Sequence, residues 1–145
     1  MIDAYIAAPF FNTKQLEIVE TIKDICKSLD IKIFSPKDES MFKQGDDPRN
    51  VLNKNCCAIL LSDLVIVVTD DKDVGTIWEA GFAYASNVDI IYLWLGYEPH
   101  MKFNIMLAAS GGAVVHSYDD LKKQLTKYAE TRTFLTTPNE GMLHE

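Results

Sequence analysis

The stretch LVIVV at residues 64–68 decides the fold class of this chain. It is unbroken, rich in β-branched residues and free of polar alternation, which is typical of a strand covered by helices on both faces of a parallel sheet. Weaker apolar runs on either side predict four further strands, at residues 4–8, 31–34, 90–95 and 113–115.

Helices are predicted between these strands. Apolar residues recur at intervals of three and four from Leu16 to Leu29, which predicts a helix that starts near Thr13. Further helices are expected at about residues 49–61, 76–85, 103–109 and 118–130. Because strands and helices alternate, the sequence predicts parallel βαβ crossovers. The expected fold class is α/β, a three-layer sandwich around a five-stranded parallel sheet of flavodoxin-like or Rossmann-like type.

The helix expected at 49–61 has four candidates for the core. Its core candidates are Val51, Leu52, Ile59 and Leu60. Cys56 and Cys57 lie in its middle with no histidine near them in the sequence, so we expect small buried apolar side chains rather than thiol nucleophiles. The tail at 131–145 has little apolar content and no period, and we expect it either to fray or to dock on a neighbouring chain.

Composition bounds the function. A chain of 145 residues with 48% hydrophobic and 24% charged residues is typical of one globular domain, which we place at 1–145. The formal net charge is −7, so no net positive field draws the chain toward a nucleic-acid polymer or an anionic membrane surface. A neutral or weakly charged small molecule fits this composition.

Cysteines, histidines and apolar runs suggest the compartment. The three cysteines are odd in number and lack the spacing of a disulfide framework or a zinc site, and the three histidines are far apart, so no metal is expected. The N-terminal run has an acid where a secretory signal carries basic residues, and the apolar runs are too short for a membrane span. We expect a cytoplasmic protein.

Three loops follow the carboxyl ends of the first three strands, where open parallel sheets bind ligands. They are residues 7–13, 35–48 and 69–76, and the last is the richest in polar groups. Asp73 lies just before the helix that follows this loop, and Glu79 lies one turn into it. Two carboxylates sharing one crevice can perform glycosyl transfer, one attacking the anomeric carbon and the other handling the proton of the leaving group. A plainer interpretation is equally open: Asp73 caps the helix and Glu79 is a solvated surface acid.

Other residues near these loops also have two interpretations. Gly75 either lets a ligand approach the backbone or only makes the turn, and Gly81 is expected to let its helix pack tightly on the sheet. The aromatic residues Phe10 and Phe11 lie on a candidate loop and suit stacking against a planar base, although ordinary core packing is also open. No glycine-rich nucleotide motif follows the first strand, so no nicotinamide or nucleoside triphosphate cofactor is expected.

Several short blocks together resemble nucleoside 2-deoxyribosyltransferases. The blocks are YIAAPFFN at 5–12, FSP at 34–36, Asp63, DVGTIWEAG at 73–81 and NIM at 104–106. They run in the same order as in the family, and EGM at 140–142 is similar to its C-terminal end. The resemblance implies the exchange of one base of a 2′-deoxynucleoside for another, with small-molecule nucleosides and free bases as partners and no cofactor.

The resemblance also implies roles for residues of the first strand and the 73–81 block. Glu79 would be the nucleophile, forming a covalent deoxyribosyl ester that the incoming base opens, so that two inversions give net retention. Asp73 would hydrogen-bond the base and help to deliver its proton, and Tyr5 would orient Glu79. Gly75 and Thr76 would contact the substrate.

Further residues would surround the base and the sugar. Phe11 would pack on the base, whereas Asn104 and Met106 would come from a neighbouring subunit to close the sugar pocket, which implies a homo-oligomer. Where family members carry Asp or Asn before the third strand, this chain has Asn55, which cannot ionise and can only position a ligand. Ser40 stands where several members carry Gln or Glu, which leaves the base preference open.

Two other functions remain open on the sequence. A hydrolase of nucleosides or of deoxynucleoside 5′-monophosphates would use the same glutamate with water in place of the second base. Ser110, Gly111 and Gly112 offer groups that suit a 5′-phosphate, whereas Asn104 suits a free 5′-hydroxyl. A non-catalytic nucleotide-binding module is the third possibility, because a fold does not fix a function.

Overall fold

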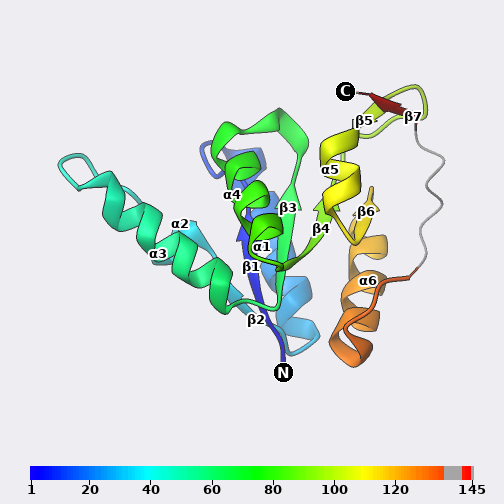
Figure 1. Cartoon of the computed structure of the whole chain (residues 1–145), viewed down its shortest axis with the longest axis horizontal. Helices are drawn as coiled ribbons and strands as arrows, with labels where there is room; N and C mark the ends of the chain where they lie inside the picture. Colours follow the sequence, from blue (N-terminus) through cyan, green and yellow to red (C-terminus); the bar gives the residue numbers. More distant parts are fainter. Residues whose placement is uncertain (136–141, 145) are drawn as a thin grey trace.

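The computed structural model describes residues 1–135 and 142–144, and its centre is a five-stranded parallel sheet with the strand order β2-β1-β3-β4-β6 (Figure 1). The strands are β1 (Asp3–Ala7), β2 (Lys32–Phe34), β3 (Leu64–Val68), β4 (Asp89–Leu93) and β6 (Ala113–Val115). This confirms the α/β fold class and the five strands expected from the sequence. The order is that of flavodoxin-like folds.

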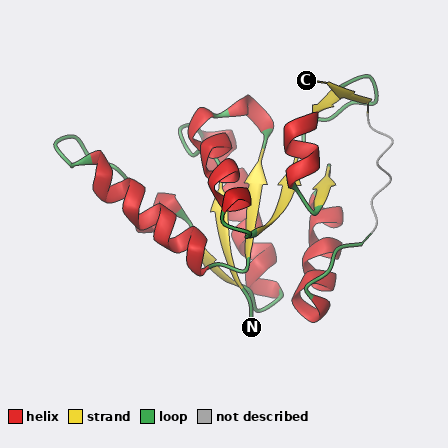
Figure 2. Cartoon of the chain, in the orientation of Figure 1, coloured by secondary structure: helices red, strands yellow, loops and turns green. Residues whose placement is uncertain are grey.

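Helices cover both faces of the sheet (Figure 2). They are α1 (Thr13–Ser28), α2 (Pro36–Glu39), α3 (Pro48–Leu61), α4 (Val74–Ala85), α5 (Ile105–Ser110) and α6 (Tyr118–Thr131). One apolar cluster joins α1 and α6 to strand residues such as Ile6 and Ile66, and a second joins α3 and α4 to residues such as Tyr5 and Val65. Successive residues of a strand point to opposite faces of the sheet. Because one apolar cluster covers each face, every residue of a central strand such as β3 has to be apolar.

Strand order reverses beside β1. Tyr5 pairs with Phe34 of β2 on one side and with Val65 of β3 on the other, because the chain crosses over β1 between these two strands. In open parallel sheets the crevice at such a reversal, beyond the carboxyl ends of the strands, is where ligands bind. The fold therefore directs attention to the loops that follow β1 and β3.

The structure corrects several details of the segments that follow β2, β3 and β4. The expected loop at 35–48 contains the short helix α2, and the polar turn at 69–76 contains a 3₁₀ turn (Asp70–Lys72), so that α4 begins at Val74 rather than at Thr76. A strand that the sequence did not predict, β5 (Lys102–Asn104), precedes α5.

Part of the C-terminal tail is regular. Strand β7 (Met142–His144) pairs in parallel with β5 of the same chain, so these residues are not frayed, and docking of the tail on a neighbouring chain stays a prediction. The expectation for residues 136–141 and 145 lies outside the described residues. Within the described ranges, no helix is long and apolar enough to cross a membrane.

Burial along α3 and α4 differs from the expected pattern. In α3 Ile59 is fully buried, but Leu52 and Leu60 are exposed. Leu52 belongs to the part of the helix that extends away from the sheet (Figure 1), whereas Leu60 is next to Ile59 at the end near the sheet and points in a different direction. Cys57 is exposed, so its assignment to the core was wrong. Gly81 is also exposed, and a methyl group there would meet nothing within 4 Å, so tight packing on the sheet does not explain this glycine.

Candidate active site

A tyrosine from the sheet and a glutamate from a helix form the centre of the site. Tyr5 is completely buried in β1, and its hydroxyl donates a hydrogen bond to Oε2 of Glu79 in α4. The Tyr5 ring stacks on Phe34 of the neighbouring strand, with 5.5 Å between the ring centroids, which fixes the direction of the hydroxyl. Glu79 is therefore held over β1 and is not a solvated surface acid, so that half of the plainer interpretation is wrong.

The surroundings of Glu79 change its acidity. Burial raises the pKa of Glu79 to about 7, the hydrogen bond from Tyr5 opposes this rise, and the charge of Asp73 adds to it. Burial, and then the nearby Glu79, raise the pKa of the Tyr5 hydroxyl, which therefore stays a donor. A carboxyl with a perturbed pKa and a fixed hydrogen-bond partner, lying near the strand reversal, is a candidate for catalysis.

Asp73 caps helix α4. Its Oδ2 accepts hydrogen bonds from the backbone nitrogen and from the hydroxyl of Thr76, both at 2.9 Å. The capping half of the plainer interpretation is thus confirmed. Thr76 is buried and occupied by this contact, whereas Gly75 next to it is exposed.

This double role of Asp73 gives a prediction. Asp73→Ala removes the helix cap and is expected to lower the free energy of unfolding by about 1 kcal/mol, whereas Asp73→Asn retains a capping oxygen and is expected to stay within about 0.5 kcal/mol of the parent. Urea unfolding of both variants measures this difference. If Asp73 acts only as a cap, the asparagine variant keeps its catalytic activity; if its carboxyl also moves a proton, both variants lose activity.

Phe11 and Asn55 lie on two segments beside this centre. Phe11, in the loop after β1, is 72% exposed and leans on Phe10 with 5.0 Å between the ring centroids, so one aromatic face is free. Asn55, in α3, accepts a hydrogen bond from the hydroxyl of Ser40, which leaves its amide nitrogen as the group with free donors. The structure thus links Ser40 and Asn55, the two positions at which the sequence departs from the family pattern.

Cys56 is a neighbour of the site that the sequence did not indicate. It is half-buried. Burial, then Cys57 and then the charge of Glu79 raise the pKa of its thiol, so Cys56 lies within electrostatic range of Glu79. The sequence predicted a buried Cys56, and the structure buries it only in part. One signal was present in the sequence: Cys56 precedes the buried Ile59 by three residues, so both face the sheet side of α3.

Asn104 and Met106 lie apart from Glu79 within one chain. Asn104 caps α5, accepting hydrogen bonds from the backbone nitrogens of Met106 and Leu107 at 2.9 and 3.2 Å. Both residues line a cavity of about 760 Å³ whose walls include Ile77 and Trp94 but not Glu79. Helix α4 lies between α3 and α5 (Figure 1); Glu79 of α4 contacts Tyr5 of β1, whereas Asn104 and Met106 belong to the α5 region and line a cavity without Glu79.

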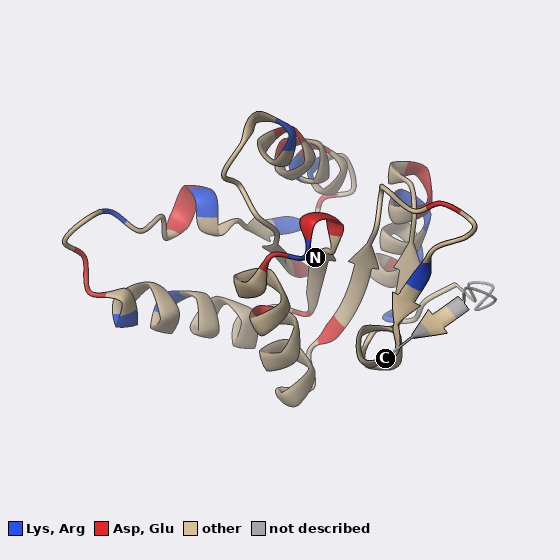
Figure 3. Ribbon diagram, turned by 90° about the horizontal axis from the view of Figure 1, so that it is seen from above, with Lys and Arg blue, Asp and Glu red and all other residues tan. Residues whose placement is uncertain are grey.

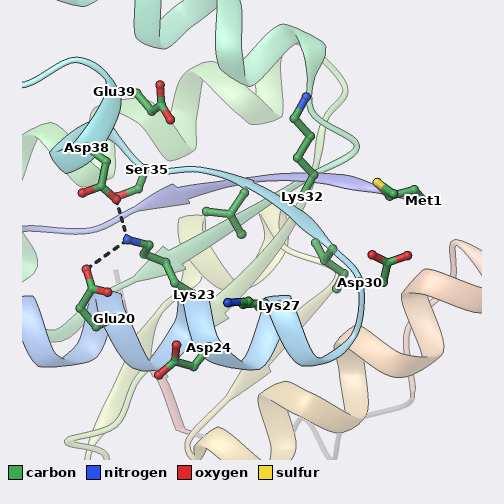
Figure 4. A pocket seen from close by; sticks show the side chains of 12 residues that line it. Met1, Glu20, Lys23, Asp24, Lys27, Asp30, Lys32, Ser35, Asp38 and Glu39 are labelled. Atoms are coloured by element: carbon green, nitrogen blue, oxygen red, sulfur yellow. Dashed lines mark hydrogen bonds and ion pairs between the residues drawn. The ribbon is translucent and has the colours of Figure 1, made fainter.

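A second cavity lies along the outer edge of β2. It measures about 530 Å³, and none of the predicted site residues lines it. Figure 4 shows Lys23 pointing between Glu20 and Asp38, with nitrogen–oxygen distances of 3.2 and 2.6 Å. Three of its lining charges, Glu20, Lys23 and Asp38, are thus paired with one another. Across residues 1–135 and 142–144, no group of three or more His, Cys, Asp or Glu side chains is arranged to hold a metal ion.

Comparisons with known proteins agree with the residue blocks. A family model described as nucleoside 2-deoxyribosyltransferase matches residues 4–129. No curated protein sequence matched the chain.

Solved structures share the fold. The 2-deoxyribosyltransferase of Bacillus psychrosaccharolyticus is 24% identical, with a TM-score of 0.72, and the match covers 83% of this chain and 90% of that one. A conserved protein from Enterococcus faecalis is 20% identical, with a TM-score of 0.77 and coverages of 88% and 98%. A CMP N-glycosidase from Clostridium botulinum is 17% identical, with a TM-score of 0.58 and coverages of 85% and 97%. Since the family model spans most of the sequence, the chain belongs to the nucleoside 2-deoxyribosyltransferase family.

Proposed function

We propose that the chain transfers the 2-deoxyribosyl group of a 2′-deoxynucleoside to another purine or pyrimidine base, with Glu79 as the nucleophile. Family membership supports an enzyme that transfers or hydrolyses a glycosyl group. The observation that carries the finer proposal is the contact between the Tyr5 hydroxyl and the half-buried Glu79 carboxyl. It holds one carboxylate oxygen still and leaves the other for the substrate.

The proposed reaction has two displacements. Glu79 attacks C1′ of the deoxyribose, the bond from C1′ to the base breaks, and Asp73 helps to supply the proton that the departing base takes up. A second base then attacks C1′ of the glutamyl ester, loses its proton and releases the carboxylate. Each displacement inverts C1′, so the product retains the configuration.

Glu79 suits the role of nucleophile better than Asp73 does. Oδ2 of Asp73 already accepts two hydrogen bonds from Thr76, which lowers its reactivity, whereas Glu79 accepts one from Tyr5. The burial that raises the pKa of Glu79 to about 7 also leaves its ionised form poorly hydrated. Such a carboxylate is stabilised by the positive charge that develops on the sugar ring.

The contacts of Ser110 and Gly112 favour a substrate with a free 5′-hydroxyl over one with a 5′-phosphate. Ser110, a candidate phosphate ligand, shares a hydrogen bond of 2.6 Å with the hydroxyl of Tyr92 and donates one of 3.0 Å to the backbone oxygen of Leu107. A methyl group on Gly112 would collide with the ring of Phe134, so this glycine is explained by close packing. These contacts give both residues structural roles.

Transfer and hydrolysis are separated by one assay. The chain is incubated with deoxyadenosine, with and without hypoxanthine, and the products are separated by chromatography. Transfer yields deoxyinosine only when hypoxanthine is present, whereas a hydrolase releases free deoxyribose in both cases, and a binding module yields neither. Without an acceptor, the intact mass is expected to rise by one deoxyribosyl unit located on Glu79.

We also infer that the working unit is a homo-oligomer in which Asn104 and Met106 serve the site of a neighbouring copy. Within one chain they line a cavity whose walls do not include Glu79. The faces of α3 and α4 are apolar and exposed: Leu60 is 56% and Trp78 51% exposed, and Glu79 is the only charged residue of α4. Figure 3 shows how few charged positions these two helices carry. An apolar surface of this kind is typical of a contact between copies.

Mixing two inactive variants tests this assembly. Glu79→Gln and Asn104→Ala are each expected to have little activity, but copies that exchange subunits regain one intact site per mixed pair. For dimers that mix at random this amounts to roughly a quarter of the parent activity. As the matched control, Glu79→Gln is mixed with Tyr5→Phe; both changes lie on the same side of the site, so this mixture is expected to show only the average of its two separate components. If the mixture of Glu79→Gln and Asn104→Ala also gains nothing over the average of its components, the shared site is contradicted.

A further inference from the structure

The structure places a buried amide, Gln15, between the two loops that carry Phe11 and Asp73. Gln15 lies in the first turn of α1 and is only 8% exposed. Its Oε1 accepts a hydrogen bond of 2.8 Å from the backbone nitrogen of Phe11, and its Nε2 donates one of 2.9 Å to Oδ2 of Asp71. One side chain thus joins the loop after β1 to the loop after β3.

The loop that receives this hydrogen bond has an unusual backbone. Asp71 has φ of 67° and Lys72 has φ of 50°, so two successive residues other than glycine lie in the left-handed region. Such conformations cost free energy and persist where the surroundings fix them. Gln15 supplies one such constraint.

Asp70 supplies the second constraint from the other side. Its carboxylate accepts hydrogen bonds from the backbone nitrogens of Leu95 and Gly96, at 2.9 and 2.7 Å, in the segment that follows β4. A side chain on Gly96 would begin 3.0 Å from this carboxylate, so glycine allows the close approach. The loop from Asp70 to Asp73 is therefore held by α1 on one side and by the segment after β4 on the other, and Asp73 caps the helix that carries Glu79.

We propose that Gln15 is a positioning residue for the reaction, setting the place of Phe11 relative to Asp73. Gln15 lines the small gap between the ends of β1 and β3 together with Pro9, Val68 and Asp71, so it lies at the strand reversal itself. It acts through Phe11 and Asp73 and needs no contact with the substrate. This inference rests on the proposed deoxyribosyl transfer, in which both of those residues approach the base.

The test compares two buried glutamines. Gln15→Met removes both hydrogen bonds at similar volume. The matched control is Gln124→Met: Gln124 is also buried and also makes two hydrogen bonds, to the backbone of Leu135, on the side of the sheet covered by α1 and α6. We expect both variants to unfold at similarly lowered temperatures. The value of kcat/KM for transfer is expected to fall on the order of 10-fold or more in Gln15→Met, with kcat affected more than KM, and to stay within about threefold in Gln124→Met.

Variants of Asp71 supply the rescue. Asp71→Asn keeps an oxygen that can accept from Gln15 and tolerates the left-handed backbone, so it is expected to keep most of the activity. Asp71→Gly tolerates the backbone but loses the contact, and it is expected to behave like Gln15→Met. Combining Gln15→Met with Asp71→Gly is expected to lower kcat/KM no further than either substitution alone, because both remove the same contact. Equal losses in Gln15→Met and Gln124→Met, or none in either, would overturn the proposal.

Amide hydrogen exchange separates failure of this inference from failure of the proposed function. In Gln15→Met, exchange is expected to quicken both in the Phe11 loop and in residues 70–73, whereas Gln124→Met leaves both segments unchanged. If the parent chain transfers no deoxyribosyl group yet exchange follows this pattern, the proposed function fails and the joining of the loops stands. If exchange in residues 70–73 does not change, Gln15 does not position the loop, whatever the activity.

Discussion

Replacing Glu79 by glutamine is expected to lower kcat for deoxyribosyl transfer by on the order of 10⁴-fold or more, because an amide oxygen cannot form the glycosyl ester. The variant keeps the shape of the side chain and an oxygen that accepts from Tyr5. Substrate binding is therefore expected to survive, which calorimetry with deoxyadenosine measures. A variant that still accumulates the deoxyribosyl adduct would show that another residue is the nucleophile.

The same substitution is expected to stabilise the protein at alkaline pH. Glu79 has its pKa raised from 4.5 to about 7 in the folded state. Between these values the folded chain binds more protons than the unfolded chain, so the contribution of this carboxyl to stability falls as the pH rises from about 4.5 to 7. Glutamine has no such loss, and at pH 8 the variant is expected to be more stable than the parent by on the order of 3 kcal/mol. Urea unfolding at pH 5 and pH 8 measures the change; an equal difference at both values would contradict it.

Tyr5→Phe is expected to move the acid limb of the pH profile for transfer to higher pH. The reaction needs ionised Glu79, so kcat/KM of the parent is expected to rise with pH through a midpoint near its pKa of about 7. The hydrogen bond from Tyr5 lowers this pKa, and a hydrogen bond to a charged group contributes about 1.5–3 kcal/mol. Its loss is expected to raise the midpoint by about one to two pH units. At pH 6 kcat/KM then falls on the order of 10-fold or more, with recovery toward pH 9.

The chain contains a matched control for this shift. Tyr92 is also buried on the same face of the sheet, but its hydroxyl pairs with Ser110 rather than with Glu79. Tyr92→Phe is expected to leave the midpoint where it is in the parent. If both variants shift the midpoint equally, or if neither does, the Tyr5 hydroxyl does not tune Glu79.

Much of the fold could be predicted because burial on both faces of the sheet leaves a local signal. The run at 64–68 is apolar at every position since alternate residues face two different helix layers. The exposure of Leu52 could not be predicted in this way, because the period of a helix gives its apolar face but not how far the helix extends beyond the sheet. Leu60 was wrongly placed in the core because it is next to the buried Ile59 but lies on another face of the helix. The pairing of β7 with β5 depends on contacts between segments far apart in the sequence, so no local pattern signals it.

The candidate site was only partly predictable for the same reason. Asp73 and Glu79 stood out because two acids flanked the start of one helix, but their different environments come from tertiary contacts. Glu79 is buried against Tyr5, which lies 74 positions away in the sequence, whereas Asp73 is satisfied within its own turn by Thr76. Cys57 was misjudged because neighbouring residues of a helix point in different directions, so Cys57 is exposed while Cys56 is half-buried. For Gln15 a signal was present: Asn12 and Gln15 have the spacing of a capping box, and Asn12 does accept from the Gln15 backbone nitrogen.

The division of the sheet into two apolar clusters has a practical consequence for engineering a heat-tolerant biocatalyst. Ala4, Ile6 and Ile66 belong to the cluster under α1 and α6, while Tyr5 and the residues around it belong to the other. Repacking the first layer at positions of α1 beyond the turn that holds Gln15, for example by larger side chains at alanine positions of the strands matched by smaller ones on α1, is expected to change thermal tolerance without replacing a residue of the proposed site. Directed-evolution libraries for durability therefore belong on that side of the molecule, and libraries for new substrates on the opposite one.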